Sequence, residues 1–309
     1  MILATTKTIG TLPHLATFLA DNPDAVAGWG RKPSGRRAIW LARLLRRRFA
    51  LLEDGFIRSV ERHSPTLSLL VDDLGVYYDA SRPSRMEQAI ARGADGGEAA
   101  RARLLATLWR THRISKYNHA PDYRGDLPDR YVLVVDQTFG DLSITGGLAD
   151  HNRFPAMLSA AIDENPGATI IVKVHPDVFS KGKNGHFPPD LLGHPRVTAI
   201  AADCHAPSLI SGASAVYCVT SLMGFEAMLW GKPVRCFGMP FYAGWGLTED
   251  ELPPPPRRGS AALEDVIHAA LVAVARYADP IGGDRWGPEQ MIAHVARERQ
   301  ALLARAAAA

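Results

Sequence analysis

The chain has 309 residues, 47% of them hydrophobic and 22% charged, and its formal net charge is +3. This length suffices for two domains, the composition is that of a globular protein, and so small a net charge does not indicate nucleic acid as a partner. No apolar run reaches the roughly 18–20 residues that span a bilayer. The first residues lack the ordered regions of a signal peptide, so we expect a cytoplasmic protein.

The cysteines and acidic residues show no pattern of a metal site. Cys204, Cys218 and Cys236 have no paired spacing, which argues against a disulfide framework. No Cys-x-x-Cys, His-Glu-x-x-His or Asp-x-Asp pattern occurs, so we expect no bound metal. The acid pair Asp72-Asp73 and the run 249–251 are expected to be turn and surface charge.

The first part of the chain predicts strands that alternate with helices. We expect strands over 2–5, 25–29, 49–52, 67–71 and 76–78, and helices over 12–20, 86–92 and 98–112. This alternation is typical of an α/β domain with a largely parallel sheet. Residues 116–130 are rich in proline, glycine and asparagine, as a linker is.

Positive charge is concentrated in residues 31–48. A helix is expected after the breaker-rich loop 30–35, with its arginines on one broad face and Leu41, Leu45 and Phe49 opposite. Such a helix either contacts an anionic membrane or glycolipid, or is a surface helix with a solvated basic face. The second alternative needs no partner, because any packed helix has an apolar face. The basic residues are Arg31, Lys32, Arg36, Arg37, Arg43, Arg46, Arg47 and Arg48.

The second part of the chain predicts another α/β block. We expect strands over 131–135, 169–174, 197–200, 215–219 and 234–237, and helices over 155–165, 205–211, after residue 221, and over 263–275 and 289–309. The predicted domains are therefore an N-terminal domain over 1–125 and a C-terminal domain over 126–285. A last helix over 286–309 has the first domain as its candidate packing partner.

Polar residues follow four of the predicted strands directly. Asp54, Asp136, His175 and Ser221 each come where a strand ends. Ligands of open α/β sheets bind outside the carboxyl ends of the strands. This recurrence predicts that the functional side chains come from these loops.

The segment from Thr220 to Val234 indicates a nucleotide site. It consists of a small-residue turn, a short helix with one acid, and Gly-Lys-Pro-Val entering a strand. A helix N-terminus suits a phosphate, and the carboxylate of Glu226 could accept hydrogen bonds from ribose hydroxyls. Lys173 and His175 in Lys-Val-His-Pro could bind the same nucleotide, although a lone His-Pro is often structural. The layout is common in the nucleotide-binding half of two-domain glycosyltransferases.

The loop 136–144 carries two candidate nucleophiles. Glycosyl transfer with retention can use a carboxylate nucleophile. Asp141 is the first choice because Gly140 and Ser143 frame it as an exposed loop acid. Asp136, at the strand end, is the alternative and could instead hold the loop by hydrogen bonds. Either acid could also be a turn-capping aspartate.

Two further loops have a functional and a structural interpretation. Glu53, Asp54 and Arg58 could face a ligand, with Arg58 binding a carboxylate or phosphate, or Asp54 and Arg58 could form an internal ion pair. Trp245, in the aromatic loop 241–248, could stack on a base or sugar ring, or belong to a packed loop.

Together these residues resemble the KpsC-type capsule polysaccharide synthesis family, bacterial retaining β-Kdo glycosyltransferases. The matching segments, in the family's order, are Gly28–Gly35, Leu52–Ser59, Gln137–Ile144, Lys173–Pro176, Ser221–Val234 and Phe241–Leu247. The resemblance implies a GT-B-like fold with two Rossmann-type domains facing each other across a cleft. It implies CMP-β-Kdo as donor, no cofactor, and a Kdo-bearing (lyso)phosphatidylglycerol acceptor at the cytoplasmic membrane face. Capsule assembly proteins are candidate partners.

The resemblance also implies roles for single residues. Asp141 would be the nucleophile of a double displacement, and Glu53 or Asp54 would assist the acceptor hydroxyl. Lys173, His175, Pro176, Ser221, Gly224 and Glu226 would bind CMP. Arg31, Lys32, Arg58, Gln137, Ser143 and Trp245 would bind substrate.

Other functions stay open at this point. Many members of the family carry two such modules in tandem, and this chain holds one, so the linkage it makes is undetermined. A transferase for a UDP- or GDP-linked sugar is one alternative. A non-catalytic module that binds anionic glycolipid through the basic helix is another.

Overall fold

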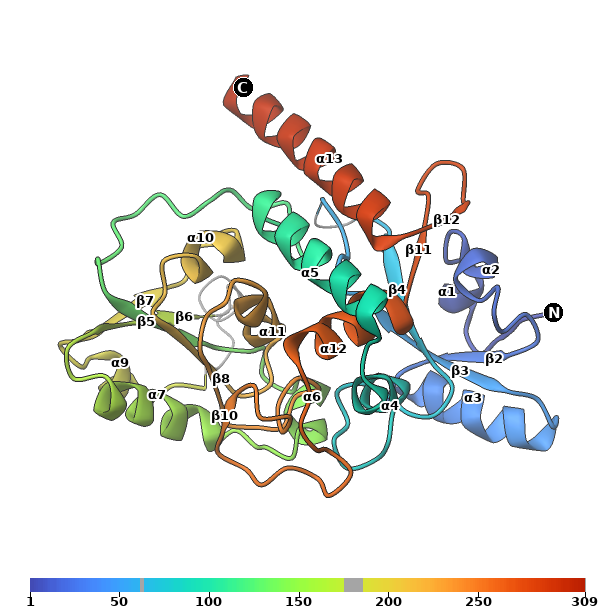
Figure 1. Ribbon diagram of the computed structural model, residues 1–309, viewed down its shortest axis with the longest axis horizontal. Coiled ribbons are helices and arrows are strands. Elements are labelled where there is room, and N and C mark those ends of the chain that lie inside the picture. The colour runs from blue at the N-terminus through green and yellow to red at the C-terminus, as the bar shows by residue number, and fades with distance from the viewer. Residues whose placement is uncertain (62–63, 175–185, 309) are drawn as a thin grey trace. The chain divides into compact units, whose positions relative to one another are not determined.

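The computed structural model describes residues 1–61, 64–174 and 186–308. The chain divides into two compact units, each with its own six-stranded sheet (Figure 1). Unit 1 comprises Met1–Tyr77, Arg82–His119 and Glu264–Ala309, and unit 2 comprises Tyr78–Ser81 and Ala120–Leu263. Two α/β units confirm the predicted fold class. The second domain was expected to run to residue 285, whereas the chain returns to unit 1 at Glu264.

The sheet of unit 2 is fully parallel. Its strands lie in the order β10-β9-β8-β5-β6-β7, and each neighbouring pair is parallel. Read from β7, this is the doubly wound order 3-2-1-4-5-6 of Rossmann folds, whose ligands bind where the order reverses, between β5 and β8. The elements are β5 (Tyr131–Val135), α6 (Leu142–Gly146), α7 (Arg153–Glu164), β6 (Thr169–Lys173), α9 (Pro189–Leu192), β7 (Val197–Ile200), α10 (Ala206–Ile210), β8 (Ala215–Cys218), α11 (Leu222–Leu229), β9 (Val234–Cys236) and β10 (Glu249–Asp250).

Burial explains the central strands of unit 2. All five residues of β5 are buried, as is typical of strands with both faces covered. Helix α7 contributes Phe154, Met157, Leu158 and Ala161 to the core, at the three- and four-residue spacing of one helix face. This packing holds the central strands in place, so the loops that follow these strands start from well-defined positions.

The sheet of unit 1 is mixed. Its order is β1-β2-β3-β4-β11-β12, with β1–β2 and β2–β3 parallel and the other pairs antiparallel. The prediction of a largely parallel sheet is therefore wrong for this half. The elements are β1 (Leu3–Ala4), α1 (Lys7–Gly10), α2 (Leu15–Phe18), β2 (Val26–Trp29), α3 (Pro33–Leu44), β3 (Phe49–Asp54), β4 (Ser68–Asp72), α4 (Arg85–Arg92), α5 (Gly96–Thr111), α12 (Leu263–His268), η1 (Ala269–Ala273), β11 (Ala275–Ala278), β12 (Arg285–Trp286) and α13 (Pro288–Ala308).

The predicted helix 263–275 is confirmed as far as Ala273, as an α-helix and then a π-helical turn, and is wrong at residue 275, where a strand begins. Helix α12 ends at His268, the π-helical turn (η1) follows, and β11 pairs antiparallel with β4, beside which it lies in Figure 1. The alanine-rich sequence favours a helix, but pairing with β4 determines the local structure. Helix α13 then packs against α5 through a bidentate Arg101–Glu289 pair, as expected for the last helix.

Two other predicted elements are absent from the described structure. Residues 76–78 form no strand, because Asp72 accepts hydrogen bonds from the backbone N–H groups of Leu74 and Gly75 and turns the chain. The helix expected over 12–20 is replaced by the short helices α1 and α2, with His14 between them at φ 58°. Both differences arise in short segments with weak periodicity.

Helix α3 packs through its small residues. Gly35, Ala38 and Ala42 are buried, and a Cβ at Gly35 would lie 1.9 Å from the carbonyl oxygen of Gly30. The prediction that Leu41, Leu45 and Phe49 form the apolar face is wrong for Leu45, which follows the helix end and is 46% exposed. Trp40 and Leu44 are thereby left on the solvent side, while Leu41 packs against the buried residues of the helix.

Candidate functional site

A hydrogen-bonded network ties two loops together at the switch point of unit 2. Gln137 follows β5, and its Oε1 accepts from the backbone N–H of Thr220, which follows β8 (2.9 Å). Gln137 Nε2 donates to Thr220 Oγ1 (3.0 Å) and to Ser143 Oγ (3.2 Å), and the two hydroxyls are 3.0 Å apart. Gln137 is buried. Its amide therefore positions the loops, rather than standing open for the substrate as predicted.

Two glycines enclose Thr220. A Cβ at Gly147 would lie 2.4 Å from Thr220 Cγ2, and one at Gly238 would lie 2.8 Å from the same methyl group. Any side chain at either position would displace the threonine. Thr220 was not among the predicted site residues, because nothing local in its sequence marks a contact with a residue 83 positions away.

Asp136 is enclosed by a second cluster. Its side chain has no exposed surface, and its Oδ1 lies 2.8 Å from His186 Nδ1 and accepts from the backbone N–H of Gln137 (2.9 Å). The ring of His186 stacks on Phe154 (centroids 3.8 Å apart) and on Phe139 of the loop (5.4 Å). The second oxygen of Asp136 has no hydrogen-bond partner among the described residues. Enclosed in this way, Asp136 holds the loop and is closed to a sugar.

Asp141 lies at the exposed tip of the same loop. It is the N-cap of α6, and its Oδ1 accepts from the backbone N–H of Ser143 (2.8 Å). Asp141 is thus a turn-capping aspartate, which was one of its predicted roles. Its side chain nevertheless stays exposed, with Gly140 at φ 81° just before it. Of the two candidate nucleophiles, Asp141 is the one that a substrate can reach.

Lys173 ends β6 in a partly buried position. Its Nζ donates to the carbonyl oxygen of Val174 (3.0 Å). Burial lowers the pKa of the ammonium, and the nearby Cys204, Asp203 and Asp136 oppose that shift. A desolvated cation at the carboxyl end of a central strand favours an anionic ligand. The other two predicted residues of this segment, His175 and Pro176, lie outside the described residues.

The start of α11 is held by a tyrosine. Ser221 is the N-cap and accepts from the backbone N–H of Met223 (3.3 Å). Tyr242 donates to the carbonyl oxygen of Ser221, and a Cβ at Gly224 would lie 2.2 Å from that hydroxyl. Gly224 is therefore required by packing. Glu226, further along α11, is only 2% exposed, so its carboxylate does not face solvent in this conformation.

The structure contradicts a stacking role for Trp245. The side chain is 1% exposed, its indole N–H donates to the carbonyl oxygen of Phe241 (2.9 Å), and the Arg258 guanidinium lies 5.8 Å from the ring centroid. Both its faces and its polar atom are occupied inside unit 2. The packed-loop alternative is the one realised.

In unit 1 the predicted charges pair locally. Arg58 Nε lies 3.2 Å from Asp54 Oδ2, and its guanidinium carbon lies 5.8 Å from the centre of the Tyr117 ring. The internal ion pair expected as an alternative is thus present, and both side chains stay about a quarter exposed (23% and 26%). Glu53 is half-buried at the end of β3. These acids lie at the carboxyl end of a strand, as predicted.

Arg31 and Lys32 lie at the other predicted strand end of unit 1. Lys32 is the N-cap of α3 and is exposed, with its ammonium 5.7 Å from the centre of the Trp29 ring. Arg31 is half-buried beside it. Both remain positioned for an anionic ligand at the carboxyl end of β2.

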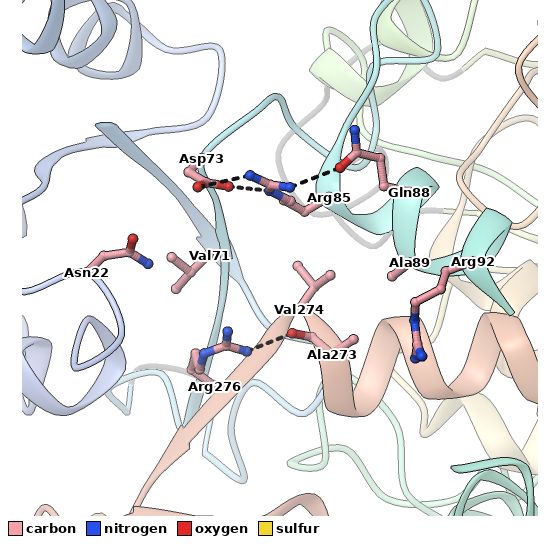
Figure 2. A pocket seen from close by; sticks show the side chains of 10 residues that line it. All are labelled: Asn22, Val71, Asp73, Arg85, Gln88, Ala89, Arg92, Ala273, Val274 and Arg276. Carbon is pink, nitrogen blue, oxygen red and sulfur yellow. Dashed lines mark hydrogen bonds and ion pairs between the residues drawn. The ribbon is translucent and has the colours of Figure 1, made fainter. Parts of the chain in front are cut away.

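A pocket of about 470 Å³ lies at the opposite end of the sheet of unit 1 (Figure 2). Asp73 follows β4, which runs antiparallel to β3, and Val274 precedes β11, so the pocket opens at the amino ends of β2 and β3. Its polar lining includes Arg85, Arg92 and Arg276. It is therefore separate from the predicted site residues of unit 1.

The described residues show neither a cluster of metal ligands nor a membrane-spanning helix. In the part of the chain that the structure describes, no three His, Cys, Asp or Glu side chains are grouped as metal ligands would be. Over the same residues, no helix combines the length and apolar character needed to traverse a membrane.

Two of the solved structures that are similar to this chain are transferases. One is Thermosulfurimonas dismutans KpsC, described as a beta Kdo 2,4 transferase, at 38% identity and a TM-score of 0.86 over 96% of this chain and 97% of that one. The other is the beta Kdo 2,7 transferase of the same protein, at 31% identity and a TM-score of 0.67 over 89% and 85%.

Sequence relatives and a family model agree with these structures. The capsule polysaccharide modification protein LipA of Neisseria meningitidis serogroup A is 40% identical over 301 residues, 89% of this chain and 43% of that protein. The lipopolysaccharide-processing protein LpsZ of Rhizobium meliloti is 38% identical over 73% of this chain and 53% of that protein. The chain thus spans about half the length of these relatives. The model of the capsule polysaccharide biosynthesis protein family matches residues 24–123 and 98–285, and the chain belongs to this family.

Proposed function

We propose that this chain is a retaining β-Kdo glycosyltransferase of capsule synthesis, with CMP-β-Kdo as donor and a Kdo-bearing lipid or oligosaccharide as acceptor. The observation that carries the proposal is an exposed carboxylate, Asp141, on a loop bonded across the switch point of a doubly wound sheet. The two similar solved structures bear the names of Kdo transferases. The similarity to these structures favours Kdo over the sugars of UDP- and GDP-linked donors.

In the proposed complex, unit 2 binds the nucleotide. The positive end of the α11 dipole and the ammonium of Lys173 are suited to the phosphate of CMP. We still predict that His175 and Pro176 contact the same phosphate. We still predict that Glu226 binds the ribose. Because its side chain is buried, the residues that cover it must move when the nucleotide binds.

The proposed reaction is a double displacement. The Asp141 carboxylate attacks the anomeric carbon of Kdo while the bond to the CMP phosphate oxygen breaks, which leaves a glycosyl ester. The acceptor hydroxyl then attacks the same carbon from the opposite side, loses its proton, and releases Asp141 as carboxylate. Two inversions retain the β configuration. Glu53 or Asp54 stays the predicted recipient of that proton.

Asp136 and His186 support this reaction without taking part in it. They hold Phe139 and the backbone at Gln137, and so fix the start of the loop that ends in Asp141. A nucleophile must be held within a fraction of an ångström of its attack position. The buried pair supplies that constraint.

The linkage can be proposed from the two similar structures. The chain is more similar to the 2,4 transferase, with a TM-score of 0.86 against 0.67 for the 2,7 transferase. We therefore expect a β-2,4 product.

The deciding experiment is incubation with a synthetic Kdo acceptor and an in situ supply of CMP-Kdo, with anomer and linkage of the product read by NMR. Calorimetry with CMP, UDP and GDP accompanies it. A β-Kdo product and binding of CMP alone support the proposal. An α-linked product, or tighter binding of UDP or GDP, contradicts it.

A further inference from the structure

The solvent side of α3 combines large apolar and basic residues. Arg36, Trp40, Arg43 and Leu44 share one side of the helix at 3.6 residues per turn. Trp40 is 62% exposed and Leu44 is 65% exposed. Exposed tryptophan and leucine among arginines are typical of helices that lie at a membrane interface.

The charge around this helix has one sign. Residues 25–52 contain eight basic residues and no acidic one. Among the described residues, Arg36 and Arg43 make no ion pair, while Arg48 lies 3.6 Å from Asp24. The side of α3 that bears Trp40 therefore keeps its positive charge and complements an anionic surface.

The arginine pocket of unit 1 continues this positive surface. Helix α3 leads into the amino end of β3, and the pocket opens at the amino ends of β2 and β3. Figure 2 shows Arg85 paired with Asp73 and Gln88, and Arg92 and Arg276 on the other sides of the pocket.

Arg276 makes this pocket suited to an anion. Its guanidinium is largely buried, and burial lowers its pKa, with Asp21 opposing the shift and Arg285 adding to it. An anionic group in the pocket would share Arg276 with Asp21 and with the carbonyl oxygens of Ala273 and Ala275, and would share Arg92 with Glu98. The phosphodiester of a lipid headgroup has this charge.

We propose that this face of unit 1, made of Arg36, Trp40, Arg43, Leu44 and the arginine pocket, docks the protein on an anionic lipid bilayer. Trp40 and Leu44 enter the interface, Arg36 and Arg43 contact headgroups, and the pocket holds one lipid phosphate. Trp40, Arg43 and Leu44 lie beyond the first turn of α3, and the last turn of this helix leads toward the amino end of β3, opposite to the strand end that carries Glu53 and Asp54.

The test uses vesicles without nucleotide or acceptor, so that it is independent of the transferase proposal. The full chain is sedimented with vesicles of phosphatidylcholine, with and without phosphatidylglycerol, at low and at high salt. We expect binding that requires phosphatidylglycerol and weakens with salt. No binding, or equal binding to both vesicles, overturns the proposal.

Matched charge variants locate the contact. Arg36→Gln/Arg43→Gln should weaken binding about 30-fold at low salt, because each arginine near an anionic surface contributes about 1 kcal/mol, or about fivefold. Arg124→Gln/Arg130→Gln removes the same charge from exposed positions of unit 2 and should change binding less than about twofold. If both variants lose binding equally, the net charge of the protein alone explains the binding, and the proposed docking face is overturned.

Two further variants test the apolar part and the pocket. Trp40→Ser/Leu44→Ser should weaken binding at low and at high salt alike, because its contribution is not electrostatic. Arg92→Gln should weaken binding about fivefold. If Trp40→Ser/Leu44→Ser binds as the unchanged protein does, the apolar residues are not part of the docking face. If Arg92→Gln does so, the pocket is not part of it. Transfer to a soluble acceptor should persist in all these variants, and its loss would instead indicate a fault in the fold.

Discussion

The strand ends of the two units hold their polar groups in different ways. In unit 2, Gln137 and Thr220 are 83 positions apart, and both polar atoms of the Gln137 amide bond to Thr220 at the edge of a fully parallel sheet. In unit 1, Asp54 and Arg58 are four positions apart and partly exposed, beside a strand that returns antiparallel. The comparison teaches that unit 2 is built to hold one geometry. The charges of unit 1 can rearrange when a substrate arrives.

The largest expected effect is on the exposed acid of unit 2. Asp141→Asn removes the nucleophile and should lower kcat by at least about a thousandfold, with little change in CMP affinity. Asp126→Asn, an exposed acid of the linker, is the matched control and should keep full activity. We would measure the transfer rate of both variants and their CMP affinity by calorimetry. Near-normal turnover in Asp141→Asn would exclude a chemical role for this residue.

The next effect concerns the buried pair. His186→Ala removes the partner of Asp136 and the ring between Phe139 and Phe154, and should lower the free energy of unfolding by about 3 kcal/mol. His194→Ala, a histidine on the loop before β7, should cost much less. Chemical denaturation measures both. A loss below about 1 kcal/mol would mean that the cluster is not a rigid support.

A smaller pair of effects tests the comparison directly. Thr220→Val keeps the shape but breaks the network, and should cost about 1–2 kcal/mol and lower kcat. Asp54→Asn weakens the ion pair of unit 1 and should cost less than about 1 kcal/mol, since both side chains are partly exposed. Thermal unfolding and transfer rates of the two variants are compared. If Asp54→Asn costs as much as Thr220→Val, the two units do not differ in rigidity.

The smallest expected effect is on pH dependence. Burial lowers the pKa of His268 from 6.5, with Glu98 opposing the shift. The folded state thus favours the neutral ring, so this contribution is present above 6.5 and is lost as pH falls below it through the folded pKa. The Tm should therefore fall between about pH 7 and 5. In His268→Gln the fall should be smaller, and an unchanged slope would show that other groups cause it.

The sequence predicted what local patterns determine. Buried strands such as Tyr131–Val135 were identified from their apolar residues, and the strand-end positions of Asp54, Asp136 and Ser221 were correct. The motif order sufficed to identify the family. These features depend on neighbours in the chain, and so a single sequence shows them.

The rest depends on contacts between distant residues. Gln137 and Trp245 were expected to meet substrate, and the structure uses one for the bond to Thr220 and buries the other. The Asp136–His186 pair joins residues 50 positions apart. The antiparallel half of the first sheet could not be predicted, because β11 comes from the far end of the chain. No local spacing marks such partners.

The place of β11 has a consequence for how the molecule forms during synthesis. Unit 2 is almost continuous in sequence, whereas the sheet of unit 1 needs both β4 and a strand that begins at residue 275. During synthesis, one edge of β4 therefore stays unpaired until β11 has been made, and unit 2 can fold in the meantime. A chain that ends before residue 275 and has been released from the ribosome should be protease-resistant in unit 2 and sensitive in unit 1.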